Sequence, residues 1–289
     1  MNVLLYIILT SLLGGGLHGQ MERGIRGRLQ DSMGPIEKVR VEVRRGHRLP
    51  ISRTIEEINV ELEGFRLKGG PPTEGLLFAK GKDVPAGKVN RIQVVARRFQ
   101  VEGLLVKELR FTIERLRYNL RKALLRKRLE ILDVGKCRGE ILLEESALNH
   151  YISPKVKEIE GFRLRLERNR VEVSGRYKTR LGISVPIVFV TRLQPQIGKI
   201  YLIDPQLKVS VIPVPSFVTE RVIGQINPIV DLNSDPALPC ILRISRLQVE
   251  GARLRAETQI FLKLAVPVRS AGGEYKLASA RAAAGRAQE

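Results

Sequence analysis

The chain has 289 residues, of which 43% are hydrophobic, 5% aromatic and 28% charged, so it can form one large all-β domain or two smaller ones. With 50 Lys and Arg against 30 Asp and Glu, its net charge is +20, which favours anionic partners such as nucleic acid or acidic lipid headgroups. The lack of Trp disfavours the stacking surfaces of single-stranded nucleic-acid binders, and two cysteines are too few for a disulfide scaffold.

The amino-terminus carries an apolar run, residues 3–13, followed by three glycines. At about 1.5 Å per residue the run is too short to cross a bilayer core of about 30 Å, and it resembles the hydrophobic part of an export signal. The signal is atypical because no Lys or Arg precedes the run. We expect residues 1–16 to be a leader or a short membrane-associating segment, and the protein to be exported or attached to the cell envelope, with a cytoplasmic location left open.

Strands account for most of the remaining chain. In residues 38–44, valines alternate with charged residues, as a half-buried strand requires. Turn-like sequences at Arg168-Asn169 and Gly251-Ala252 predict two hairpins, and a change of parity near Ser245 predicts a bulge. The predicted strands are residues 36–45, 54–67, 88–101, 104–118, 129–143, 159–167, 170–179, 181–193, 197–203, 206–213, 239–250 and 253–264.

Helices are few. Residues 17–33 and 119–128 are basic segments that can form helices, whereas residues 144–152 and 216–229 carry apolar side chains at helical spacing. Residues 17–266 are expected to form the folded domain. The tail that follows, residues 267–289, has no long apolar pattern and is expected to be disordered or weakly helical.

The predicted strands offer more apolar surface than these helices can cover. The sheet must therefore curl on itself or hold another apolar molecule. One strand, near residues 181–190, has no charged side, so it lies either in an ordinary core or along a lipid groove.

No catalytic pattern is evident in the sequence. The three histidines form no metal-spaced pair, and neither a nucleophile elbow nor a phosphate-binding glycine loop occurs. Residues 231–235 imitate the start of a calcium loop, but Pro236 and Leu242 stand where Gly and Glu are needed. We therefore expect no catalytic residue, no metal and no cofactor. For Cys137 and Cys240, two buried thiols and a disulfide both stay open.

A basic cluster lies between Arg97 and Arg128, with eleven Lys or Arg and three Glu. Near an anionic membrane each such charge contributes about 1 kcal/mol, and the leucines among them can enter the headgroup region. The alternative is a basic face that is merely solvated. The candidates for headgroup or membrane contact are Arg121, Lys122, Arg126 and Lys127.

Two stretches resemble signatures of the LmeA-like phospholipid-binding family. Residues 141–149, Ile-Leu-Leu-Glu-Glu-Ser-Ala-Leu-Asn, are similar to a strand that runs into an acidic-flanked helix with Leu-Asn. Residues 226–232, followed by Leu238-Pro239 and by the strand pair around Gly251, are similar to the family's closing Asn-Pro, Asp-Leu and Leu-Pro pattern. The order of elements also matches from about residue 17 to residue 264.

The resemblance implies a tubular lipid-binding type of fold, α+β and mostly β. In it, a long curved antiparallel sheet wraps around a few helices and encloses an elongated apolar cavity. The resemblance also implies a bacterial cell-envelope setting, and it supplies no catalytic residues. Asn149 and Asn227 are expected to bond backbone groups at helix ends, and Pro228 to end its helix.

The sequence thus predicts a non-enzymatic phospholipid-binding or lipid-shuttling protein of the bacterial envelope that docks on an anionic membrane surface. Nucleic acid is not expected as a partner, and the oligomeric state is open. The alternatives are a nucleic-acid-binding β protein, an enzyme or accessory factor of envelope glycolipid biosynthesis, and a purely structural envelope protein. The predicted cavity-lining residues are Phe111, Ile113, Leu181, Ile183, Val185, Ile187, Phe189, Phe217, Val222 and Ile223.

Overall fold

The fold is mostly β, as the sequence predicts. A computed structural model describes residues 27, 29, 35–45, 54–67, 77–78, 85–101, 103–121, 130–168, 170–178, 182, 184–209, 216–232, 240–262, 267–269 and 275–277. Of these residues, 74% lie in strands and 13% in helices, which confirms the α+β, mostly-β class.

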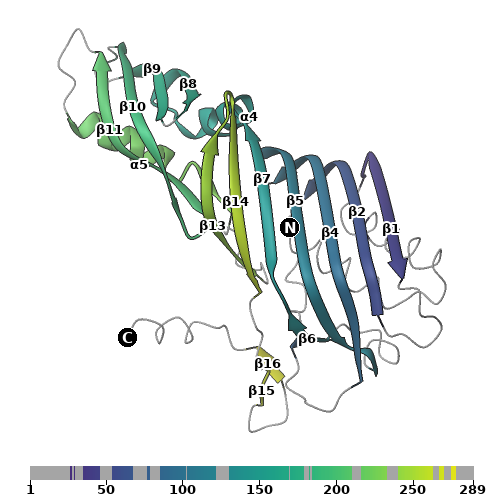
Figure 1. The fold of residues 1–289 in the computed structure, drawn as a ribbon. Helices are drawn as coiled ribbons and strands as arrows, with labels where there is room; N and C mark the ends of the chain where they lie inside the picture. The colour runs from purple at the N-terminus through teal and green to yellow at the C-terminus, as the bar shows by residue number, and fades with distance from the viewer. Residues whose placement is uncertain are drawn as a thin grey trace.

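Within the described residues, the larger sheet has nine strands, and its main path runs β1-β2-β4-β5-β7-β14-β13 (Figure 1). The short strands β3 and β6 pair with each other, and β6 also pairs with the end of β5. The strands are β1 (Lys38–Arg45), β2 (Thr54–Leu67), β3 (Leu77–Phe78), β4 (Ala86–Val101), β5 (Leu104–Asn119), β6 (Glu130–Val134), β7 (Cys137–Glu144), β13 (Cys240–Val249) and β14 (Arg253–Leu262).

One neighbouring pair on this main path, β2 with β4, is parallel, whereas the other pairs are antiparallel. Parallel neighbours need a long crossover, and the chain between β2 and β4 has room for one because it includes β3, which pairs with β6. The bulge expected near Ser245 is confirmed by a shift of register between Ile244 and Arg246.

The smaller sheet has five strands in the order β12-β11-β10-β9-β8, all antiparallel (Figure 1). The predicted hairpin at residues 168–169 joins β8 and β9. The strands are β8 (Ile159–Glu167), β9 (Arg170–Lys178), β10 (Ser184–Gln196), β11 (Lys199–Val209) and β12 (Val230–Asp231).

Two predicted strand boundaries are wrong. The segments at 197–203 and 206–213 form one strand, β11, which follows a tight turn at Ile197-Gly198 with φ of 40° and 80°. The predicted break at residues 204–205 is a bulge within this strand, because Asp204 has a φ of 49° and the register with β10 shifts between Val190 and Arg192. The segment 129–143 divides into β6 and β7 at Gly135, where an added Cβ would lie 2.4 Å from the Glu114 carbonyl oxygen.

The two helices predicted from apolar spacing are present. They are α4 (Glu145–Ile152), followed by the 3₁₀ turn η1 (Ser153–Lys155), and α5 (Ser216–Ile226). α5 ends two residues before Pro228, because the residue before a proline disfavours the helical conformation. Of the basic segments predicted as helices, residues 27, 29, 120 and 121 are helical, Asn119 ends β5, and the others lie outside the described residues.

Near the carboxyl end, β15 (Pro267–Arg269) and β16 (Tyr275–Leu277) form a small antiparallel pair inside the segment that the sequence predicts to be disordered. The other residues of that tail, and the expected leader at residues 1–16, lie outside the described residues. The predicted division of the chain into leader, domain and tail stays a prediction.

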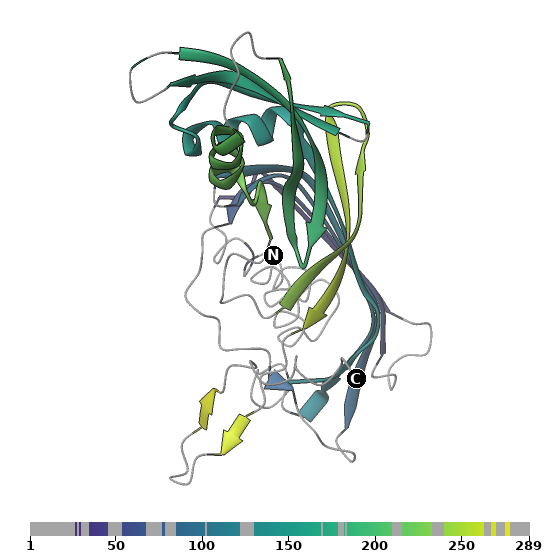
Figure 2. The same ribbon diagram turned by 90° about the vertical axis from the view of Figure 1, so that its left-hand side faces the viewer.

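Both sheets and both helices share one apolar core. Buried side chains from the two sheets, from α4 and from α5 belong to one connected cluster. Figure 2 shows the larger sheet edge-on and curved, with both helices on its concave side. We call the side of the sheet that faces the helices the inner face, and the opposite side the outer face.

Two asparagines tie the helices to the smaller sheet. The Asn149 side chain, in α4, donates to the Leu164 carbonyl oxygen at 2.7 Å and accepts from the Leu164 N–H at 2.6 Å. Asn227, just after α5, makes the same pair of bonds to Leu202 of β11, both at 2.8 Å. An amide carries a donor and an acceptor side by side, so each asparagine satisfies strand backbone groups that no neighbouring strand pairs. Both asparagines bond backbone groups as predicted, but the groups in these four hydrogen bonds belong to strands and not to helix ends.

Candidate functional site

The inner face of the larger sheet is a continuous apolar wall. Because alternate residues of a strand face the same side, the strand register aligns buried or partly buried residues into rungs across the seven strands of the main path. One rung is Val41, Val60, Val94, Phe111, Gly139, Thr258 and Ile244. The next is Val39, Leu62, Ala96, Leu109, Ile141, Ala256 and Leu247. Further along, the rings of Phe65 and Phe99 stack with centroids 5.0 Å apart.

The helices and the smaller sheet face this wall with apolar side chains of their own. Leu148 and Ile152 on α4, and Val222 and Ile226 on α5, are buried in the same cluster as the wall. Ile187, Phe189 and other residues of the smaller sheet join it. The interior between the sheets is therefore lined with hydrocarbon from every element that borders it.

The outer face of the same sheet is polar. Oppositely charged residues stand next to each other on neighbouring strands, and Arg97 pairs with Glu108 at 3.0 Å. Arg98 contacts Glu63 at 3.0 Å, and also Glu37 at 2.8 Å. The sheet therefore has one side suited to hydrocarbon and one suited to water.

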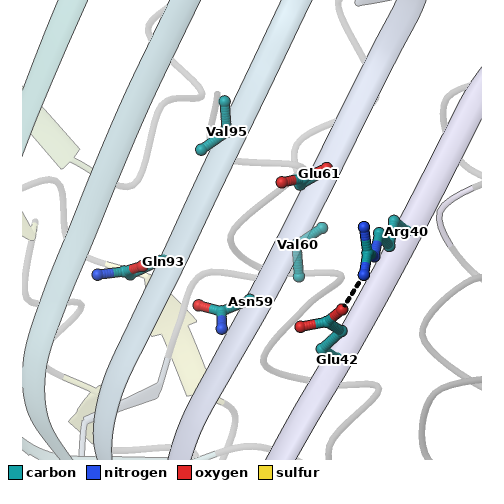
Figure 3. A pocket seen from close by; sticks show the side chains of 7 residues that line it. All are labelled: Arg40, Glu42, Asn59, Val60, Glu61, Gln93 and Val95. Carbon is teal, nitrogen blue, oxygen red and sulfur yellow. Dashed lines mark ion pairs between the residues drawn. The ribbon is translucent and has the colours of Figure 1, made fainter.

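A hollow of about 250 Å³ lies on this outer face, over β1, β2 and β4 (Figure 3). Its side chains are mostly charged or amide-bearing, and Arg40 and Glu42 form an ion pair of 2.5 Å at its border. Burying an acyl chain is favourable only against apolar surface, so this hollow is unsuited to hydrocarbon. The lining residues are Arg40, Glu42, Asn59, Val60, Glu61, Gln93 and Val95.

The structure brings six of the ten predicted lining residues together. Phe111 and Ile113 of β5, Ile187 and Phe189 of β10, and Val222 of α5 are buried in the shared cluster, and Ile223 packs against it. Val185 is partly buried opposite Tyr177 of β9. Leu181 and Ile183, and the side chain of Phe217 in α5, lie outside the described residues. Contact between these residues and acyl chains stays a prediction, as does the elongated cavity.

The sequence-based selection missed most of the wall. In the larger sheet, the predicted lining residues all lie on β5. The rungs also include residues of the six other strands of the main path, β1, β2, β4, β7, β14 and β13. Alternation marked the apolar side of each of these strands, but only the register shows that their apolar sides are the same side.

Thr258 and Tyr118 are side chains with a polar group that are buried in or beside the wall. Thr258 is 3% exposed, and its hydroxyl oxygen has no hydrogen-bond partner within the described part of the chain. Tyr118 packs over Gly87, where an added Cβ would lie 2.3 Å from the Tyr118 Cζ atom. Burial raises the pKa of the Tyr118 phenol.

The structure describes one of the four predicted membrane-contact cations, and it describes the start of the calcium-loop-like sequence. Arg121 is exposed just after β5, whereas Lys122, Arg126 and Lys127 lie outside the described residues. Asp231, the first residue of the calcium-loop-like sequence, is bound by Lys199 at 3.0 Å, and this contact raises the pKa of the Lys199 ammonium. Among the described residues, no group of three or more His, Cys, Asp or Glu is placed to hold a metal ion.

No helix in the described part of the chain combines the length and hydropathy that a bilayer span requires. The fold and the wall define a class of protein, in which a curled β-sheet turns one continuous apolar face towards a few helices. Over residues 83–259, more than half of its length, the chain matches the family described as LmeA-like phospholipid-binding. The chain belongs to this family and is thus a lipid-binding protein in the general sense.

The match includes both stretches that carry the resemblance, residues 141–149 and 226–232, and it covers less than the expected span of 17 to 264. The comparisons with curated proteins and with solved structures give no significant match.

Proposed function

We propose that this protein is a non-enzymatic carrier that takes up phospholipid acyl chains between the apolar wall and the facing helices, and moves lipid within the bacterial cell envelope. The observation that carries the proposal is the wall itself, whose rungs cross the seven strands of the main path with no charged side chain in them. Membership of a phospholipid-binding family supports the choice of ligand.

Acyl chains alone supply enough binding free energy for this role. Each buried methylene contributes roughly 0.8 kcal/mol, so about ten of them give about 8 kcal/mol, which corresponds to micromolar affinity. Such binding needs little recognition of the headgroup. We therefore expect several phospholipids with similar chains to bind with similar affinity.

The first experiment is lipid extraction and native mass spectrometry of the purified protein. We expect phospholipid to be bound, and to move between donor and acceptor vesicles when the protein is added. A protein that purifies without lipid and transfers none would overturn the proposal. Turnover of a lipid substrate by the pure protein would show that it is an enzyme and would overturn the non-enzymatic carrier function.

A matched pair of variants tests the lining. Val185 and Val188 lie on the same strand, β10, and both are partly buried. Val185 is on the same side of the strand as the buried Ile187 and Phe189, whereas Val188 is on the opposite side. A carboxylate at position 185 would stand against acyl chains, so Val185→Asp should lose bound lipid and Val188→Asp should keep it. Thermal melts report folding. A folded Val185→Asp protein with full lipid occupancy would remove this strand from the lining.

A further inference from the structure

One end of the larger sheet's outer face is strongly basic. This basic end lies where β4 begins, β5 ends and β7 begins, next to β6 (Figure 1). Its cations are all exposed to solvent. They are Lys88, Arg115, Arg117, Arg121, Lys136 and Arg138.

The strand register and the backbone hold these residues together. Lys88 and Arg117 are direct neighbours across β4 and β5. Arg115 has a left-handed φ of 56°, and its carbonyl oxygen accepts from the Gly135 N–H at 3.2 Å, so the next residue, Lys136, lies beside it. Arg138 stands opposite Thr112 of β5, two strands from Lys88. The cluster is therefore fixed by the sheet.

Within the described part of the chain, these six cations form no ion pair. Among the described residues, two carboxylates, Glu114 and Asp133, lie next to them, so these eight side chains carry a net charge of +4. Two like charges directly opposite each other destabilise a strand pair. Asp133 of β6 stands opposite Arg117 on its other side and offsets part of this repulsion, but the excess of positive charge in the cluster remains, which points to an anionic partner outside the fold.

The opposite end of the same face is different. There Arg97 pairs with Glu108, and Arg98 with Glu37 and Glu63. Arg255 on β14 contacts Glu140 and Glu250, both at 3.3 Å. Neighbouring carboxylates pair with these three arginines, whereas the cations of the basic end are available to a partner.

We propose that the basic end is the surface by which the protein docks on an anionic phospholipid bilayer. The proposal rests on the carrier function, because a carrier must meet a membrane to load and unload. A phospholipid-binding family makes a bilayer the anionic partner of choice over nucleic acid. Each cation at an anionic membrane contributes about 1 kcal/mol, or about fivefold in affinity, and salt screens the attraction beyond a Debye length of about 8 Å.

The test is flotation with vesicles of equal parts phosphatidylcholine and phosphatidylglycerol, against vesicles of pure phosphatidylcholine. We expect binding to the anionic vesicles alone, weakening as salt is added. Lys88→Glu removes two units of positive charge and should weaken binding by about 25-fold. The same change places a carboxylate opposite Arg117, so this variant should unfold at the same temperature as the wild type or a higher one.

Arg163→Glu is the matched control. Arg163 is also exposed, lies on β8 of the smaller sheet opposite Ser174, and gives the same change of net charge. It should keep wild-type vesicle binding. Equal losses in both variants would show a response to total charge and would overturn the docking end. Binding to duplex DNA that Lys88→Glu abolishes, without vesicle binding, would overturn it in favour of nucleic acid.

Lipid occupancy separates this proposal from the carrier function. Lys88 is on the outer face, so the Lys88→Glu protein should purify with as much lipid as the wild type. An empty wild-type protein that still docks would count against the carrier and leave the docking end standing. A wild-type protein that carries lipid but does not bind anionic vesicles would support the carrier function and overturn the docking end.

Discussion

The two faces of the larger sheet are built from the same strands and differ in almost every physical respect. On β4, Val94 belongs to an apolar rung and is 1% exposed, while its neighbour Val95 is partly buried and borders the polar hollow of the outer face. The difference teaches that position relative to the pleat, rather than residue type, decides what a side chain does here. Identical substitutions on the two faces should therefore have very different effects.

The largest effect is expected from Val94→Asp, compared with Val95→Asp. An aspartate at position 94 would bury a carboxylate among apolar neighbours, which should lower the free energy of unfolding by about 4 kcal/mol or more. At position 95 the cross-strand neighbours are Glu61 and Arg110, whose opposite charges largely cancel, so the loss should stay below about 1 kcal/mol. Urea unfolding measures both. Similar losses would mean that the two faces are not distinct in solution.

The sequence predicts the long strands of the larger sheet well because their alternation is a local property. The predicted strands at 54–67 and 104–118 agree with β2 and β5 to within one residue. Direction and register are not local. Nothing within β2 or β4 indicates that the two run parallel, and nothing marks Val60, Val94 and Phe111 as one rung. That information lies in pairings between distant segments.

The candidate site could be predicted only in part for the same reason. Phe111 and Phe189 are predicted lining residues that lie on predicted strands, and both lie in the shared core. In the sequence, Lys88 and Arg117 are ordinary charged residues of two different predicted strands, 29 residues apart. Only the strand register shows that these two cations are direct neighbours across β4 and β5. Alternation therefore finds apolar sides, whereas a surface composed of several strands needs the fold.

A smaller effect, of opposite sign, is expected from two buried threonines. Thr258 sits in an apolar rung with its hydroxyl oxygen unpartnered among the described residues, whereas the Thr191 hydroxyl donates to the Ile203 carbonyl oxygen at 2.6 Å. Replacing Thr258 with valine keeps the shape and removes an unsatisfied polar group, so the free energy of unfolding should rise by about 1 kcal/mol.

Thr191→Val is its control, because it removes a hydroxyl whose hydrogen bond is made and should lower the free energy of unfolding by about 1 kcal/mol. Urea unfolding of lipid-free protein compares the two variants. If Thr258→Val loses as much stability as Thr191→Val, the Thr258 hydroxyl has a partner in solution and the wall is less uniformly apolar than its rungs indicate.

The smallest effect is confined to alkaline pH and comes from Tyr118, which is 6% exposed. Because burial raises the pKa of its phenol above the ordinary value of 10.0, the folded protein holds this proton more tightly than the unfolded chain does. The resulting stabilisation is fully present below pH 10.0 and is lost as the pH rises through the folded-state pKa. Tyr118→Phe has no phenol proton to lose. Between about pH 9 and pH 11 the wild type should therefore lose more of its free energy of unfolding than this variant does. A constant difference across that range would mean that the phenol reaches water in solution, and the apolar wall would then be open at the end where β4 begins.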